Sequence, residues 1–353
     1  MIYCDNIIFS LQKAGGISVV WQNLLSEMQK KGIDFFVLEY GRAINNIFRQ
    51  QLKLPAEKIV QRNFTLSKNI EQLLNVQIEK TKVPFIFHSS YYRLCSNSKS
   101  INVTTVHDFI YEKGVIKLGL PERIRVWQNH RAIYGSEKIV CISENTRKDL
   151  LTYLPNIDEN KVIVIYNGVS EDYRMVSQKQ SKYQDYILFV GGREGYKNFD
   201  FVVKSLSKSK YNLLICGNEL LPREKTLLDE CLGLRRYHFI LRPSNKELNL
   251  IYNSVYCLIY PSSYEGFGIP ILEAQRAGCP VIALNSSSIP EVVGDGGLLL
   301  QKLDSKELLS TIADINSGRN RVLLIEKGLK NSLRFSWEKM ASEYISLYKS
   351  LLK

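Results

Sequence analysis

Two glutamates, Glu265 and Glu273, flank a short glycine-containing segment in the second half of the chain, which reads E-G-F-G-I-P-I-L-E. Pro270 occupies the position preferred for the first residue of a helix. Gly266 and Gly268 allow an anion to approach the backbone closely, and the first amide groups of a helix have no internal partner. The segment therefore predicts a phosphate site. The amides that would face the phosphate belong to Phe267, Gly268 and Ile269.

The spacing of the two carboxylates indicates what accompanies the phosphate. Glu273 lies about one turn inside the predicted helix, where it would repel a phosphate that it touched. Its better use is to accept hydrogen bonds from hydroxyl groups beside the phosphate, as on a ribose. Glu265 would face the group on the far side. The pattern predicts a nucleoside diphosphate carrying a hydroxyl-rich group, and the alternative is an ordinary βαβ crossover with incidental glutamates.

A second glycine-rich segment, Gly191–Asn198, places two cations directly after a predicted strand. Arg193 and Lys197 are four residues apart, so both side chains can approach one diphosphate. The alternative interpretation is a solvated basic turn.

The flanking sequence predicts the elements that position these groups. The apolar runs Tyr186–Val190, Tyr256–Tyr260 and Pro280–Leu284 predict buried strands, each next to one of the glycine-containing segments. The chain begins with a similar unit, in which Ile2–Phe9 is the expected strand and a helix ends at Gly32. The loop between this strand and this helix contains Gly15 and Gly16.

The motif E-G-F-G-x-P-x-x-E resembles the signature of retaining glycosyltransferases of family 4, which have the GT-B architecture. The resemblance implies an α/β fold of two Rossmann-like domains that face each other across a cleft, with a C-terminal helix crossing back to the first domain. We expect an acceptor-binding domain at 1–170 together with the helix 337–353. A linker at 171–184 and a nucleotide-sugar-binding domain at 185–336 follow.

The resemblance also implies roles for individual residues. His107, in T-V-H-D-x-x-x-E, would contact the donor sugar near the reacting carbon, and Glu265 would help to orient that sugar. Arg193 and Lys197 would neutralise the leaving diphosphate. The remaining donor contacts expected are Gly15, Gly16, Arg242 near the base, Gly266, Phe267, Gly268, Ile269 and Glu273. The acceptor contacts expected are His88, Tyr91, Tyr92 and Asp108, although His88 has a structural role as its alternative.

The motifs H-S-S-Y-Y-R, T-V-H-D and G-G-R-x-x-Y-K-N are similar to those of the bacterial mannosyltransferase-like branch. They favour GDP-mannose as the donor, with a UDP-hexose second, and a lipid-carrier-linked glycan of a surface polysaccharide, such as O-antigen or capsule, as the acceptor. No DxD-type acidic pair follows a predicted strand, and the two cations can replace Mg²⁺. We therefore expect a metal-independent enzyme without a cofactor.

Composition limits the other classes of protein. The chain has 353 residues, a net charge of +12 spread over both halves, and 45% hydrophobic residues, which suits two globular domains. It has no apolar run of about 18 residues, and its first residues do not resemble a signal peptide. Its seven cysteines are scattered, as expected of reduced thiols. We expect a cytoplasmic protein, with the inner face of the cytoplasmic membrane as a candidate contact.

Two alternatives to a transferase remain open. A GT-B epimerase would bind the same nucleotide and release free sugar without an acceptor. A non-enzymatic module that binds polyanions or membranes would use the basic helix expected at 121–134, which contains Arg123, Arg125, Trp127 and Arg131. Nucleic acid is not an expected partner, because the sequence has no zinc-ligand spacing and no concentrated run of lysine and arginine.

Overall fold

The computed structural model describes residues 1–63, 68–78, 81–177, 181–315 and 318–353. Two compact units account for these residues. Unit 1 consists of Met1–Gly168 together with Trp337–Lys353, and unit 2 consists of Val169–Ser336. Each unit has its own sheet and its own hydrophobic core, as two domains of this length require.

The described strands of unit 1 form one parallel sheet in the order β3-β2-β1-β4-β5-β6-β7. Buried apolar side chains dominate its central strands, as expected for a sheet covered on both faces. Their bounds are β1 Ile2–Asp5, β2 Phe36–Tyr40, β3 Ile59–Arg62, β4 Phe85–Ser89, β5 Ser100–Val106, β6 Lys138–Cys141 and β7 Val162–Val164.

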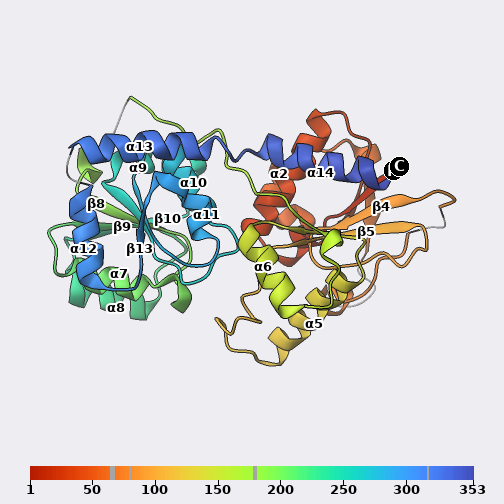
Figure 1. Ribbon diagram of the computed structural model, residues 1–353, viewed down its shortest axis with the longest axis horizontal. Coiled ribbons are helices and arrows are strands. Elements are labelled where there is room, and N and C mark those ends of the chain that lie inside the picture. The colour runs from red at the N-terminus through yellow and green to blue at the C-terminus, as the bar shows by residue number, and fades with distance from the viewer. Residues whose placement is uncertain (64–67, 79–80, 178–180, 316–317) are drawn as a thin grey trace. The chain divides into compact units, whose positions relative to one another are not determined.

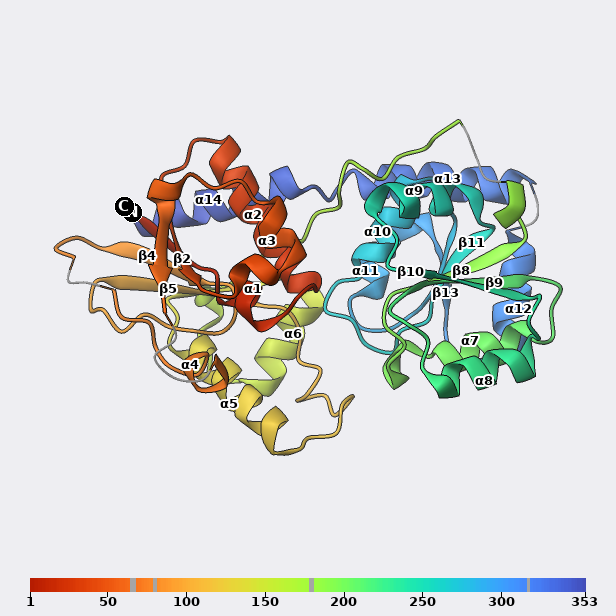
Figure 2. The same cartoon turned by 180° about the vertical axis from the view of Figure 1, so that it is seen from behind.

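Helices cover both faces of this sheet (Figures 1 and 2). One face carries α2 and α14, and the opposite face carries α5 and α6. The helices of unit 1 among the described residues are α1 Ile7–Leu11, α2 Gly16–Lys30, α3 Ile47–Gln51, α4 Lys68–Glu71, α5 Leu120–Tyr134, α6 Glu144–Tyr153 and α14 Trp337–Leu351.

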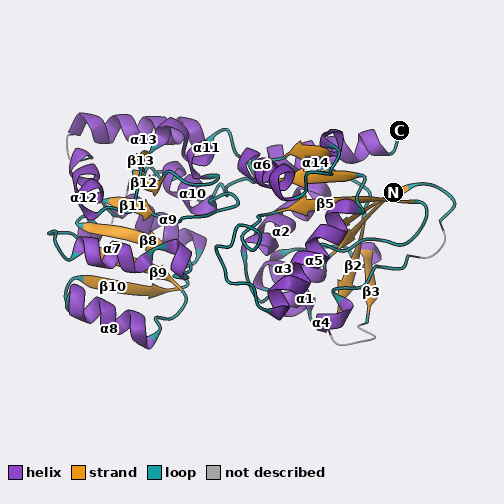
Figure 3. Cartoon of the chain, turned by 60° about the horizontal axis from the view of Figure 1, so that its bottom comes forward, coloured by secondary structure: helices purple, strands orange, loops and turns teal. Residues whose placement is uncertain are grey.

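The described strands of unit 2 form a second parallel sheet, in the order β10-β9-β8-β11-β12-β13. These strands are β8 Tyr186–Val190, β9 Asn212–Gly217, β10 Tyr237–Leu241, β11 Cys257–Tyr260, β12 Val281–Leu284 and β13 Leu298–Leu300. The helices are α7 Phe199–Leu206, α8 Pro222–Cys231, α9 Asn245–Ser254, α10 Ile269–Arg276, α11 Ile289–Val293, α12 Ser305–Asp314 and α13 Gly318–Ser332. Figure 3 shows the strands of each sheet side by side between helices.

Both sheets reverse their strand order at one point, between β1 and β4 in unit 1 and between β8 and β11 in unit 2. In an open parallel sheet the loops that follow the two strands at such a point diverge and leave a crevice in which ligands bind. In unit 2 these loops are the segments that begin at Gly191 and at Pro261. The topology therefore brings together the two glycine-containing segments, Gly191–Asn198 and the segment between Glu265 and Glu273, that the sequence predicts to bind phosphate.

One predicted strand is too long. The expected strand Ile2–Phe9 ends at Asp5, and Ile7–Leu11 forms the short helix α1. The amide of Phe9 donates to the carbonyl oxygen of Asn6, and the amide of Gln12 donates to that of Ile8. Periodicity could not detect this change, because a continuous run of buried apolar residues suits a buried strand and a buried helix equally well.

The segment 171–184 was expected to be a linker between the domains. In the structure Val169 and the residues after it already belong to unit 2. The amides of Arg174 and Val176 donate to the side-chain oxygens of Asn249 and Asn253, both at 2.9 Å. These bonds attach the segment to α9. Residues 178–180 of the expected linker lie outside the described residues.

The C-terminal helix α14 returns to unit 1 and packs beside α2 (Figure 1). Its attachment includes a buried polar network. Nδ1 of His88 lies 2.6 Å from the hydroxyl of Tyr348, and Nε2 lies 2.9 Å from that of Thr105. The Thr105 hydroxyl in turn lies 2.8 Å from that of Tyr344. Burial lowers the pKa of His88 to about 3, so the ring is neutral at physiological pH and serves as a hydrogen-bonding group.

Among the residues that the structure describes, none of the helices has the length and the apolar character needed to cross a bilayer.

We predict that Tyr348→Phe lowers the free energy of unfolding of unit 1 by about 1–3 kcal/mol, because it leaves a buried nitrogen of His88 without its partner. Trp21, Trp127 and Trp337, the protein's three tryptophans, all belong to unit 1, so denaturant titration followed by tryptophan fluorescence reports the unfolding of this unit. Tyr134→Phe is the matched control, since Tyr134 is exposed, and we expect a change within about 0.5 kcal/mol. Equal stability of the two variants would contradict the structural role of His88.

Candidate functional site

The loops after β8 and β11 are joined by an ion pair. Nζ of Lys197 lies 2.5 Å from Oε1 of Glu265. The side chain of Asn198 adds two hydrogen bonds between the same loops. Its Nδ2 donates to the Pro261 carbonyl oxygen and to the Ser263 hydroxyl, both at 2.7 Å. Two site residues predicted from separate motifs, 68 positions apart in the sequence, are therefore in direct contact.

The N-terminus of α10 begins as the sequence predicted, with Pro270 in its first turn. Gly268 has φ 107°, a conformation that favours glycine because a side chain would be strained there. Hydrogen bonds to two serines at the start of α11 hold the loop that precedes α10. The Ser287 hydroxyl accepts from the Glu265 amide at 2.8 Å, and the Ser288 hydroxyl lies 3.0 Å from the Phe267 carbonyl oxygen. The amides before α10 are thus fixed in place before any ligand binds.

Arg193 is buried and has a carboxylate partner of its own. Its Nε donates to Oε2 of Glu224 at 2.9 Å, and its Nη2 donates to the carbonyl oxygens of Asn218 and Glu219. Its Nη1 is buried, and none of the described residues forms a hydrogen bond with it. A side chain at Gly217 would crowd this nitrogen, since an added Cβ would lie 3.3 Å from it. Most of the guanidinium is therefore used to anchor the loop, and one buried nitrogen remains to meet an anion.

Glu273 is half-buried on α10 and lies among tyrosines. The Tyr252 hydroxyl donates to its Oε2 at 3.0 Å. Burial raises the pKa of Glu273 to about 7, and hydrogen bonds from Tyr252 and Tyr173 oppose this shift. The carboxylate can accept further hydrogen bonds in its ionised form, as binding of sugar hydroxyls requires.

Arg242 follows β10 with a positive φ of 42°. Its Nε donates to Oδ1 of Asn218, which follows β9, at 2.9 Å. These two loops lie at the same edge of the sheet as the Lys197–Glu265 pair, because all of these strands are parallel. Arg242 is exposed and is available to a ligand group at this edge.

In unit 1, Gly15 and Gly16 begin α2. No described atom lies within 4 Å of the position that a Cβ of Gly16 would occupy, whereas a Cβ on Gly15 would lie 2.5 Å from the side-chain oxygen of Gln12. The helix end is therefore open at Gly16 and covered by Gln12 at Gly15. His107 follows β5 and is half-buried, and burial lowers its pKa to about 4. Its ring is therefore neutral at physiological pH and can serve as a hydrogen-bond donor or acceptor.

The structure argues against two of the expected acceptor contacts. His88 is 1% exposed, and both of its ring nitrogens have protein partners. Tyr92 is 5% exposed, and its hydroxyl accepts from the His107 amide. Tyr91 and Asp108 are half-buried, and Asp108 also accepts from the amide of Ile110. His88 and Tyr92 are used for contacts within the protein. Tyr91 and Asp108 are therefore the remaining candidates for contact with the acceptor.

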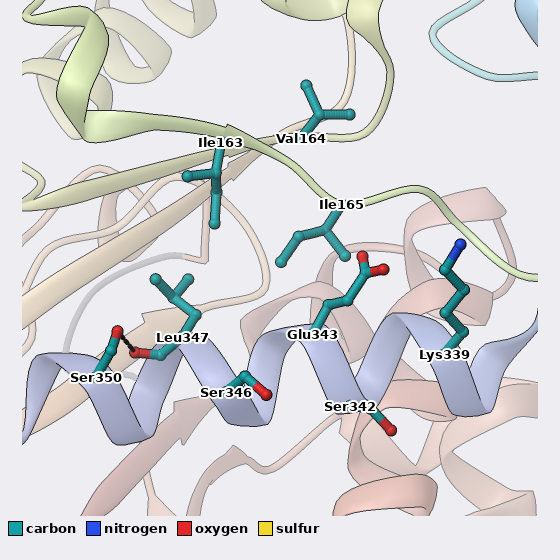
Figure 4. Close-up of a pocket in the computed structure, with 9 residues that line it drawn as sticks. All are labelled: Ile163, Val164, Ile165, Lys339, Ser342, Glu343, Ser346, Leu347 and Ser350. Atoms are coloured by element: carbon teal, nitrogen blue, oxygen red, sulfur yellow. Dashed lines mark hydrogen bonds between the residues drawn. The ribbon is translucent and has the colours of Figure 1, made fainter.

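A surface pocket of about 520 Å³ lies elsewhere, between β7 and α14 (Figure 4). Ile163, Ile165 and Leu347 contribute its apolar wall, and Glu343 reaches toward the strand. It contains none of the predicted site residues, whereas His88 and His107 line a smaller pocket in the same unit. Among the described residues, no group of three or more His, Cys, Asp or Glu side chains is arranged to hold a metal ion.

Sequence reasoning missed the residues that support the site. Glu224, Ser287 and Ser288 fix Arg193 and the Glu265 loop. Tyr173 and Tyr252 surround Glu273. The two serines lie in the sequence S-S-I-P-E-V, whose proline is a signal for the start of a helix, here α11. Nothing in the sequence indicates Glu224 or the tyrosines, because their contacts depend on how the helices and the segment before β8 pack.

Two family models match this chain. The model described as Glycosyltransferase Family 4 matches residues 14–173, and the model described as Glycosyl transferases group 1 matches residues 171–331. The O-antigen chain mannosyltransferase B of Escherichia coli is 27% identical over 76% of this chain and 74% of its own. The O-antigen chain mannosyltransferase RfbU of Salmonella typhimurium is 34% identical over 50% of this chain and 51% of its own.

A solved structure supports the fold. The sucrose-phosphate synthase of Thermosynechococcus elongatus superimposes with a TM-score of 0.79 at 16% identity, over 99% of this chain and 98% of its own. The two parallel-sheet α/β domains are thus the GT-B fold that the motif predicted. The family models, the fold and the paired motif residues agree, and the protein belongs to the family 4 glycosyltransferases.

Proposed function

We propose that the protein is a retaining glycosyltransferase that moves a hexose from a nucleoside-diphosphate sugar to a glycan acceptor. The observation that carries the proposal is the Lys197–Glu265 pair beside the N-terminus of α10, at the switch point of the second sheet. A cation, a row of fixed amides and a carboxylate one turn further are the groups that a diphosphate and a ribose require. In this proposal the donor nucleotide binds to unit 2 and the acceptor binds to unit 1.

The proposed donor is GDP-mannose, and a UDP-hexose is the second candidate. The names of two relatives support mannose, since both are called O-antigen chain mannosyltransferases. The acceptor in this proposal is a growing surface polysaccharide, such as the O-antigen of lipopolysaccharide or a capsule, on a lipid carrier at the inner face of the cytoplasmic membrane.

We expect GDP-mannose to raise the thermal unfolding midpoint more than UDP-glucose or ADP-glucose, because a ligand that binds only the folded state stabilises it. The same order is expected in excess EDTA, since Lys197 and Nη1 of Arg193 supply the positive charge for the diphosphate. Transfer of labelled mannose to a polyprenyl-linked oligosaccharide should likewise continue in EDTA. Activity that is lost in EDTA and restored by Mg²⁺ or Mn²⁺ would overturn metal independence, and a larger shift with UDP-glucose would exclude the GDP-mannose assignment.

The leaving-group role makes a kinetic prediction for Lys197. Lys197→Met removes one charged contact to the departing diphosphate and should lower kcat by about 10²–10³-fold. Lys208→Met is the control, because Lys208 is exposed and belongs to no part of the site. Arg193→Ala is a poorer probe, because the Arg193–Glu224 pair is buried more deeply than the Lys197–Glu265 pair, so breaking it costs more stability. A Lys197→Met enzyme with kcat within about threefold of wild type, a change below about 1 kcal/mol, would rule out the role.

We further propose that α5 contacts an anionic membrane. Leu120, Ile124 and Trp127 are 72%, 40% and 54% exposed, and their i, i+4, i+7 spacing puts them on one face of the helix. Exposed Arg123 adds positive charge, and the Arg131 guanidinium lies over the Trp127 ring. An apolar stripe flanked by arginines suits an interface with anionic lipid headgroups.

Vesicle binding tests this surface. The protein should co-sediment with vesicles of phosphatidylcholine and phosphatidylglycerol, and the emission of Trp127 should shift to the blue while buried Trp21 and Trp337 stay constant. The double variant Leu120→Ser/Trp127→Ser should lose about tenfold or more in affinity, since it removes two exposed apolar side chains that would insert into the lipid on binding. Leu234→Ser, at a residue 75% exposed in unit 2, is the control. Equal binding by both variants would contradict the proposal.

A further inference from the structure

Two tyrosines from different parts of unit 2 meet at Glu273. Tyr252 comes from α9, is 1% exposed and donates to Oε2 of Glu273 at 3.0 Å. Tyr173 comes from the segment Val169–Val176, which precedes β8, and is 3% exposed. The two tyrosine rings pack edge to face with their centroids 5.9 Å apart. The carboxylate therefore lies against a wall formed by buried aromatic rings and their hydroxyl groups.

The segment that carries Tyr173 is attached along its length. The Arg276 guanidinium donates to the Val169 carbonyl oxygen at 3.0 Å, which ties its start to the end of α10. The Tyr173 hydroxyl lies 3.3 Å from Oδ1 of Asn245, the first residue of α9. Together with the bonds from the amides of Arg174 and Val176 to α9, these contacts hold the tyrosine in position without a ligand.

We propose that Tyr173 and Tyr252 are positioning residues, which fix the Glu273 carboxylate so that it accepts hydrogen bonds from the ribose hydroxyls of the donor. This inference rests on the function proposed above. A carboxylate has about four lone-pair positions. Tyr252 occupies one of them on Oε2, and the hydrogen bond from Tyr173 occupies a second. The remaining positions can accept from two neighbouring hydroxyls of a ribose. Fixing the carboxylate in advance reduces the entropy lost when the nucleotide binds.

The tyrosines also favour the ionised form of Glu273. Burial raises the pKa of this carboxyl group to about 7, and hydrogen bonds from the two tyrosines lower it. Burial raises the pKa values of Tyr173 and Tyr252 themselves, so both stay neutral donors across the physiological range. The other titratable or charged groups around the cluster are Asp172, Tyr260, Arg276 and Cys279.

The test is calorimetric binding of GDP and of UDP to the full-length protein between pH 6 and pH 9. Wild-type affinity should rise through about pH 7, as Glu273 ionises. Tyr173→Phe and Tyr252→Phe each remove a hydrogen bond to the ionised form, so the midpoint of this rise should move to higher pH. Affinity at pH 7 should fall about tenfold, while the difference from wild type should narrow at pH 9.

Two further variants separate the possible outcomes. Glu273→Gln reports the pH dependence of all other groups, including the terminal phosphate of the nucleotide, and should bind weakly without the rise near pH 7. Tyr237→Phe is the matched control, because Tyr237 also donates to a carboxylate, Asp229, at 2.6 Å, but lies outside the site. It should bind like the wild type.

Failure of the inference and failure of the proposed function give different results. Wild-type affinity in Glu273→Gln would reject the ribose contact and with it the proposed function. Weak binding by Glu273→Gln, combined with a wild-type midpoint in both tyrosine variants, would reject the positioning role alone. Thermal melts of each variant confirm folding, and either tyrosine variant is sufficient if the other does not fold.

Discussion

The ion pair between Lys197 and Glu265 is the contact on which the rest of the site depends. It joins the loops after β8 and β11, the two strands between which the second sheet reverses its order. In a doubly wound sheet the chain leaves these strands in opposite directions, so the hydrogen-bond ladder of the sheet does not extend into the loops. The ion pair, the side-chain amide of Asn198 and a backbone hydrogen bond from the Ser263 amide to the Tyr196 carbonyl oxygen connect them. They place the cation of one motif and the carboxylate of the other beside the first turn of α10.

Buried charge in unit 2 is neutralised in pairs. Arg193 is opposed by Glu224 and Lys197 by Glu265, while the partners of Glu273 among the described residues are the neutral hydroxyl groups of Tyr252 and Tyr173. A buried charge without a partner costs several kcal/mol, so the ligand-free protein needs the carboxylates as well as the cations. The same pairs keep the side chains in fixed rotamers. An anionic ligand would meet cations that are already ordered. Its binding would therefore lose less entropy than binding to flexible side chains.

The first unit shows how a residue can stand at a functional position and be used for the fold. His88 lies next to the last residue of β4, at the edge of the sheet where ligands bind in this class of fold. Tyr348, 260 residues later, occupies one of its ring nitrogens. The helix α14 therefore completes the core of unit 1 and removes His88 from the surface. This use of a histidine is the ordinary one for a buried neutral imidazole.

Local sequence determined much about this protein: the strands and helices around each glycine-containing segment, the helix start at Pro270, and the family to which the chain belongs. These features depend on residues within a few positions of one another, where turn chemistry and periodicity act. The bend after Asp5 escaped this reasoning, because buried strands and buried helices share apolar runs. Only the tertiary structure decided that Lys197 meets Glu265, that Glu224 holds Arg193, that tyrosines from two segments enclose Glu273, and that His88 belongs to the core. Each of these contacts joins residues far apart in the chain, and hydrogen bonding and burial between such residues are fixed by packing rather than by sequence spacing.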